Sequence, residues 1–127
     1  MSTPFKPRSG PIVIEASLSG PAGQSDLRLI LDTGATTSLI QSTVLVAVGY
    51  DPDASSDRVR VTMGGGVAVV PRVILNRLSA LGHHRLGIPV LAHSLLPAMG
   101  IDGLLGLDFL RGSVLTIDFK AGQIDLT

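Results

Sequence analysis

Apolar and polar residues alternate along much of the chain with the period of two that half-buried β-strands show. The alternation is regular over residues 12–18 and again over residues 27–31. Between these runs lies the turn-forming segment Gly20-Pro21-Ala22-Gly23-Gln24. The two runs therefore predict a β-hairpin, and its second strand delivers Asp32 at its end.

Strand patterns continue through the second half of the chain. Residues 58–63 and 67–70 flank the triplet Gly64-Gly65-Gly66, which indicates a hairpin with a mobile tip. Pro71 is expected to end the pairing of this hairpin or to place it at a sheet edge, and residues 82–85 are expected to form a turn. The other expected strands cover residues 73–75, 80–81, 86–93, 104–106, 114–119 and 123–126.

Helical patterns are few and short. Ser42 can cap a helix that runs to Val48, with Gly49 just past its end, although the β-branched residues of this segment leave a strand open. Asp108 can cap a single helical turn that ends at Gly112. The chain is therefore predicted to be all-β, with one or two short helices.

The composition agrees with one β-rich domain. The chain has 127 residues, of which 45% are hydrophobic, and its 15 glycines and 8 prolines suit short strands and tight turns better than a helical bundle. Residues 1–11 contain three of the prolines and are expected to form an extended arm. The folded domain is then expected to span residues 12–127.

The net charge and the absence of cysteine exclude several classes of function. The 10 basic and 10 acidic residues give a formal net charge of zero, so nucleic acid and anionic membranes are not expected partners. The absence of cysteine excludes disulfides, thiol catalysis and thiolate metal sites. Neither an apolar run of roughly 20 residues nor the apolar core of a signal peptide is present, so we expect a cytoplasmic protein.

The sequence Asp32-Thr33-Gly34-Ala35 follows directly on the apolar strand of residues 27–31. A carboxylate in an apolar setting is costly unless backbone amides and hydroxyls hold it. Gly34 lets the backbone turn sharply, and the hydroxyl residues around it can bond to the turn. Those residues are Thr33, Thr36, Thr37 and Ser38. Taken alone, the tripeptide also fits a simple strand-to-turn junction in which Asp32 bonds its own backbone.

Asp32-Thr33-Gly34-Ala35 resembles the active-site signature of the aspartic proteases, and its single copy in a short chain resembles their retroviral, retropepsin-like branch. Leu104-Leu105-Gly106, with a short helix after it, resembles the second hydrophobic-hydrophobic-glycine element of that family. The glycine-tipped hairpin of residues 58–70 lies between the two motifs, where such enzymes keep their flap. The resemblance covers roughly residues 10–127 and implies a single-lobe, closed, barrel-like fold that is active as a dimer.

This resemblance implies an aspartic endopeptidase in which one Asp32 from each subunit of a homodimer activates water. Thr33 would bond across the subunit interface, and Gly34 would give a polypeptide substrate close access to the backbone. The implied substrate-binding residues are Ala35, Met63, Gly64, Gly65, Gly66, Leu104 and Leu105. Neither Asp102-Gly103 nor the segment around Asp118 repeats the motif, which is why a second copy is required. No metal or cofactor is implied.

The sequence departs from the viral pattern at one place. Viral enzymes pair an acidic residue shortly after the motif with an arginine after the second glycine, whereas this chain has Thr36, Thr37 and Leu107 there. The missing ion pair leaves open what braces the turn, with Asp108 and Arg111 as candidates. It also leaves open a non-catalytic peptide-binding or dimerisation module on the same fold, or a latent protease.

Two other patterns could suggest chemistry of a different kind. The histidines at positions 83, 84 and 93 could suggest a metal site, but a surface turn and a strand end explain them better in a chain without cysteine. The glycine triplet could suggest a phosphate loop, but neither the following Lys-Ser/Thr pair nor a helix start is present.

Overall fold

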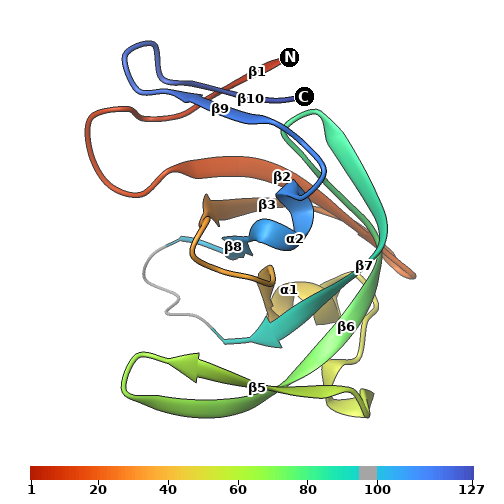
Figure 1. Ribbon diagram of the computed structural model, residues 1–127. Coiled ribbons are helices and arrows are strands. Elements are labelled where there is room, and N and C mark those ends of the chain that lie inside the picture. The colour runs from red at the N-terminus through yellow and green to blue at the C-terminus, as the bar shows by residue number, and fades with distance from the viewer. Residues whose placement is uncertain (95–99) are drawn as a thin grey trace.

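The computed structural model describes residues 1–94 and 100–127 of the chain. Its centre is a closed barrel of six strands, drawn in Figure 1, in which the last strand pairs back with the first. Around the barrel the order is β2 (Val13–Gly20), β3 (Gly23–Leu31), β8 (Gly103–Leu105), β4 (Leu39–Gln41), β7 (His83–His93) and β6 (Gly66–Ala80). The predicted all-β, barrel-like fold is confirmed.

The alternating apolar and polar residues of the strands face the inside and the outside of this barrel, respectively. In the hairpin of β2 and β3, Ile14 pairs with Leu29 and both side chains are fully buried, whereas Glu15 and Arg28 pair beside them and are exposed. Most buried residues of the other strands join the same core, whose largest fully buried side chain is Phe109. A period of two therefore sorts each strand into a core face and an outer face.

A long hairpin projects from the barrel. It consists of β5 (Arg58–Met63) and the first part of β6, and its tip holds the glycine triplet. The pairing between β5 and β6 ends at Pro71, as expected, and β6 continues from Arg72 beside β7. At the base of the hairpin, the pKa of Asp57 is lowered by its hydrogen bonds from Arg72 in an exposed ion pair.

The two ends of the chain meet in a separate three-stranded sheet, which lies above the barrel in Figure 1. Its order is β1 (Ser2–Pro4), β10 (Gln123–Leu126) and β9 (Leu115–Asp118). The hairpin of β9 and β10 was predicted from the sequence, but the position of β1 beside β10 was not. The arm of residues 1–11 therefore adds a strand within its own subunit.

Two short helices and one helical turn complete the chain, and some predicted details were wrong. Helix α1 (Ser42–Ala47) begins after Gln41, so Ser42 is its first residue and not its cap, and the alternative of a strand is excluded. Asp108 lies inside α2 (Leu107–Leu110), after Gly106 at the N-cap position. The segment 51–57 contains the 3₁₀ turn η1 (Pro52–Ala54). Residues 83–85 belong to β7, because the turn before it is shorter than expected.

Candidate active site

The Asp32 turn and the Leu104-Leu105-Gly106 segment, distant in sequence, lie together in the structure. Strand β8 is inserted between β3 and β4, parallel to the former and antiparallel to the latter. Leu31 and Leu105 are register partners, so the ends of β3 and β8 lie next to each other. The turn that begins at Asp32 leaves β3 at this point and returns as β4 on the other side of β8.

Asp32 is half-buried and is held by backbone groups on both sides. Its N–H donates to the carbonyl oxygen of Leu105 at 2.9 Å, and its own carbonyl oxygen accepts a bond from the N–H of Ala35 at 3.1 Å. The N–H of Gly34 donates to its carboxylate Oδ1 at 2.9 Å. Its Oδ2 accepts no hydrogen bond from the part of the chain that the structure describes. One carboxylate oxygen is thus anchored, and the other is available for chemistry.

Two glycines of the second segment are required by close backbone contacts. A Cβ atom on Gly106 would lie 2.5 Å from the carbonyl oxygen of Ala35, and a Cβ atom on Gly103 would overlap the carbonyl oxygen of Leu39. Side chains other than hydrogen would therefore push the Asp32 turn and β4 away from β8. The glycine of the hydrophobic-hydrophobic-glycine motif is present because the catalytic-type turn packs directly on it.

A polar cluster of Ser38 and Asp108 braces the turn in place of the missing ion pair. Asp108 Oδ1 accepts a bond from Ser38 Oγ at 2.6 Å, and its Oδ2 accepts one from the N–H of Ser38 at 2.9 Å. Ser38 Oγ in turn accepts a bond from the N–H of Gly106 at 2.9 Å. Backbone bonds from Leu107 to Ala35 and from Asp108 to Thr36 run alongside. Of the two candidates, Asp108 provides the brace, whereas Arg111 is exposed.

The role of Ser38 was missed by sequence reasoning, which treated it as one of several turn hydroxyls. It is the one polar residue in the described segments that is classed as buried, with no exposed surface. The available signal was its position, because it directly precedes the buried pair Leu39 and Ile40. Arg85 was also missed. It donates to the carbonyl oxygen of Phe109 at 3.0 Å and lies over the Phe109 ring, which ties β7 to α2.

The hairpin of β5 and β6 packs on the barrel through a second, smaller apolar cluster. Leu39, Val70 and Leu91 are its buried members. Around them pack four partly buried residues, Val59, Val61, Ala68 and Leu104. Leu104 thus lies on the side of β8 that faces the hairpin, whereas Leu105 is fully buried in the main core on the other side. The hairpin thus packs on the outer face of β4, β7 and β8 through aliphatic side chains.

The tip of this hairpin is open. Met63 ends β5, Gly66 begins β6, and all three glycines of the tip are exposed. A Cβ atom on any of them would meet nothing within 4 Å. Only Gly64, with a φ of +47°, has a backbone conformation that disfavours other residues. Open space therefore surrounds the hairpin tip, which is where a substrate-covering flap is expected.

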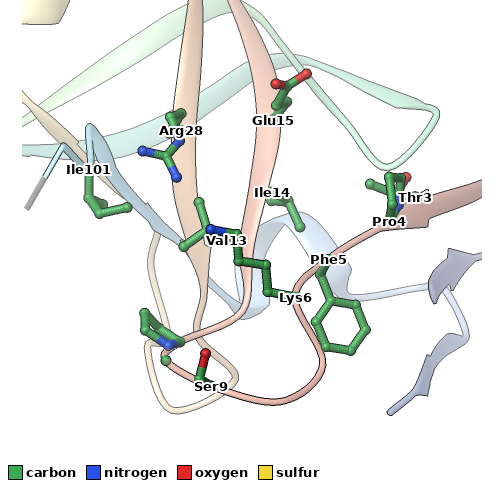
Figure 2. Close-up of a pocket in the computed structure, with 12 residues that line it drawn as sticks. Thr3, Pro4, Phe5, Lys6, Ser9, Val13, Ile14, Glu15, Arg28 and Ile101 are labelled. Atoms are coloured by element: carbon green, nitrogen blue, oxygen red, sulfur yellow. The ribbon is translucent and has the colours of Figure 1, made fainter. Parts of the chain in front are cut away.

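Two cavities lie beside the N-terminal arm, and neither is lined by Asp32. Figure 2 shows the first, a cavity of about 630 Å³ in which Phe5, Lys6, Val13, Arg28 and Ile101 surround the space between the arm, β2 and β3. The Asp32 turn therefore lies outside both of these cavities.

Two of the three histidines make hydrogen bonds within the chain. His83 Nε2 donates to the carbonyl oxygen of Leu126 at 2.6 Å, and His84 Nδ1 lies 2.6 Å from Ser79 Oγ. His93 ends β7. Among residues 1–94 and 100–127, no group of three or more His, Cys, Asp or Glu residues is placed to hold a metal ion. Within the same residues no helix has the length and apolar character needed to cross a membrane.

Comparison with known proteins agrees with this geometry. Residues 14–109, more than half of the chain, match the family model described as aspartyl protease. The chain therefore belongs to the aspartyl protease family, and its fold is that of the retropepsin-like branch. It is similar to the crystal structure of a retropepsin-like aspartic protease from Rickettsia conorii, with a TM-score of 0.73 and 20% sequence identity over 99% of this chain and 88% of the other. No curated protein matches the sequence.

Proposed function

We propose that the chain is an aspartic endopeptidase that works as a homodimer, with Asp32 of each subunit forming the catalytic pair. The observation that supports this most directly is the state of the Asp32 carboxylate. Oδ1 is anchored by Gly34, and Oδ2 accepts no bond from the described residues. Family membership supports protease chemistry, and the single motif in the chain calls for a second copy.

In this mechanism the two carboxylates share one proton across a bound water molecule, because two like charges about 3 Å apart cannot both stay ionised. Aspartic proteases are the established example of such a pair. The ionised carboxylate takes a proton from the water as its oxygen attacks the peptide carbonyl carbon. The protonated carboxyl group gives its proton to the carbonyl oxygen, which forms a tetrahedral gem-diol. As the C–N bond breaks, the carboxyl group that took the proton from water gives it to the leaving nitrogen, and the other carboxylate takes a proton back from a gem-diol hydroxyl. Thr33 would bond across the interface, and Gly34 would contact substrate backbone.

The substrate we propose is an extended peptide with aliphatic side chains near the cleaved bond. The partly exposed side chains where the hairpin packs on the barrel are all aliphatic: Val59, Val61, Ala68 and Leu104. In this proposal the tip, Met63-Gly64-Gly65-Gly66, closes over the peptide and excludes water, with Ala35 and Leu104 below it.

The first test is Asp32→Asn, with Asp26→Asn on the exposed part of the same strand as the matched control. The amide cannot exchange the proton, so cleavage of a mixed peptide pool should fall by at least about 10²–10⁴-fold at acidic through neutral pH. The Asp26→Asn variant should cleave like the unmodified chain. Equal cleavage by Asp32→Asn would overturn the proposal. Peptide binding without any cleavage, unaffected by Asp32→Asn, would instead indicate a binding module on this fold.

A further inference from the structure

The cavity drawn in Figure 2 has walls that hydrogen bonds and packing hold in place. On the side of the arm, the N–H of Phe5 donates to the carbonyl oxygen of Gly122 at 2.9 Å, and the Phe5 ring packs edge-on against the ring of Phe119. On the other side, the paired strands β2 and β3 bound the cavity. Its volume of about 630 Å³ lies within the range of roughly 300–1,000 Å³ that small-molecule sites occupy. The cavity is therefore preformed and has the size of a site for a small molecule.

Apolar side chains line this cavity from several elements. Phe5 comes from the arm, Val13 and Ile14 come from β2, and Ile101 comes from the segment before β8. An aliphatic ligand chain gains free energy against such side chains, because the gain grows with the apolar area that leaves water. The walls therefore favour a ligand with an aliphatic body.

Two cationic side chains reach the same cavity from distant parts of the chain. Lys6 belongs to the arm, and Arg28 lies on β3. Figure 2 shows the Lys6 amino group extending over Val13 on the side where Arg28 lies, whereas the Glu15 carboxylate points away from Lys6. Among the residues with described positions, the one ion pair lies at the base of the β5–β6 hairpin, so neither cation of the cavity is paired with a carboxylate. Both charges are thus available to an anion.

The guanidinium of Arg28 is oriented by the chain and keeps donors for a ligand. Its Nη1 donates to the carbonyl oxygen of Gly100 at 3.3 Å, which uses one of its five N–H donors. Asp102 accepts a bond from the backbone N–H of Arg28 and does not line the cavity. With Lys6 and Glu15, the lining has one positive charge in excess. A carboxylate matches that excess, whereas a phosphate monoester carries about 1.5 to 2 negative charges at neutral pH.

We infer that this cavity is a binding site, separate from the Asp32 turn, for a small aliphatic carboxylate. The ionised head group lies between Lys6 and Arg28, where the guanidinium fork and the ammonium both donate to it, and the chain lies against Val13 and Ile101. No residue of the Asp32 turn lines the cavity, so the site is independent of the proposed cleavage. Because one cation is on the arm and the other on the barrel, the bound ligand ties the arm to β3 and stabilises the folded chain.

Isothermal titration calorimetry of the full-length chain with octanoate tests the chemistry of the ligand. Octan-1-ol has the same chain without the charge and should bind roughly 3- to 30-fold more weakly. Hexanoate has the same charge and two CH₂ groups fewer, so its affinity should be roughly 5- to 15-fold lower. The capped peptide acetyl-Gly-Gly-Leu, which ends in a free carboxylate, should bind no more tightly than octanoate. A higher unfolding temperature in octanoate is a second readout that needs no heat of binding.

Three charge variants at exposed positions test the location of the site. Lys6→Gln and Arg28→Gln should each weaken octanoate binding by roughly 3- to 30-fold, because each removes a charged donor. Glu15→Gln should strengthen it by roughly 2- to 5-fold, because it removes a negative charge from the lining. Arg60→Gln, at an exposed position of β5 outside the cavity, is the control and should bind octanoate like the unmodified chain.

Four results would overturn the inference. The first is an absence of both heat and thermal stabilisation at millimolar octanoate. The second is an octanoate affinity that is the same in Lys6→Gln, Arg28→Gln and the control, since the ligand would then bind elsewhere. The third is equal binding of octan-1-ol, which would remove the role of the charge. The fourth is tighter binding of the peptide than of octanoate, which would make a peptide end the occupant in place of a free acid.

Discussion

At the scale of single residues, the geometry of the candidate site depends on Ser38 and Asp108, whose hydrogen bonds hold the Asp32 turn in place. Ser38 and Asp108 join two segments that are 70 residues apart in the chain. Their bonds are made in a region where Ser38 has no exposed surface. Buried polar groups of this kind stabilise a fold when each has a partner, and they are costly when one partner is removed.

Ser38→Ala should lower the free energy of unfolding by about 1–3 kcal/mol, because the N–H of Gly106 and one oxygen of Asp108 lose their partner. Asp108→Asn should cost a similar amount, because its single NH₂ group would replace one acceptor oxygen and face a backbone donor, the N–H of Ser38 at Oδ2 or that of Phe109 at Oδ1. Urea unfolding measures both. The two losses should not add in the double variant, since they remove one cluster. Thr36→Ala, at an exposed hydroxyl of the same turn, is the control, and a Ser38→Ala protein as stable as that control would contradict the role of the cluster.

At the scale of elements, the position of β8 between β3 and β4 makes the site. The three residues of β8 separate those two strands. Gly103 at the start of β8 and Gly106 just after its end each lie against a neighbouring backbone. The glycines of the β5–β6 tip serve a different purpose, because open space surrounds them. The glycines beside β8 are thus required by close backbone contact, whereas those of the hairpin tip are surrounded by open space.

Gly106→Ala and Gly65→Ala should therefore differ. The added methyl group at Gly106 would meet the carbonyl oxygen of Ala35, so we expect a loss of stability of about 1–3 kcal/mol and a displaced Asp32 turn with reduced cleavage. The same change at Gly65 meets no atom within 4 Å and should leave the free energy of unfolding nearly unchanged. Thermal unfolding with a peptide-cleavage assay checks both. Equal destabilisation by the two changes would show that close packing is not what requires Gly106.

At the scale of the whole molecule, the chain folds around a closed barrel core, and its two ends are tied together above the barrel. Asp32 lines neither of the two described cavities. The proposed function needs a second Asp32, which a second copy of the chain would supply.

Cleavage should accordingly depend on protein concentration. If two subunits make one site, specific activity should rise with concentration below the dimer dissociation constant and level off above it. Peptide cleavage over a dilution series, with sedimentation of the same samples, would check this. Mixing the unmodified chain with excess Asp32→Asn should suppress activity, because mixed dimers have one ionisable partner. Specific activity that is constant on dilution into the monomer range would contradict a shared site.

The sequence alone determined most of the strands, the hairpins and the order of the two motifs, although β4 and the start of β7 were not predicted. These features are local, because a period of two, a glycine-rich turn and an aspartate after an apolar strand can be recognised within about ten residues. The Asp32 turn, Leu104-Leu105-Gly106 and the pairing of β9 with β10 were all expected on that basis. The domain limits and the roles of the individual site residues stay predictions.

Only the tertiary structure decided which distant groups meet. The strand order of the barrel brings Ser38 to Asp108 and turns Leu104 toward the hairpin and Leu105 into the core. The separate terminal sheet sets β1 beside β10. No local pattern encodes these contacts, because they depend on strand order and register around a closed sheet. The edge positions of β1, β5 and β9 in the described part of the chain were likewise decided by the tertiary structure, because strand order is not visible in a local pattern.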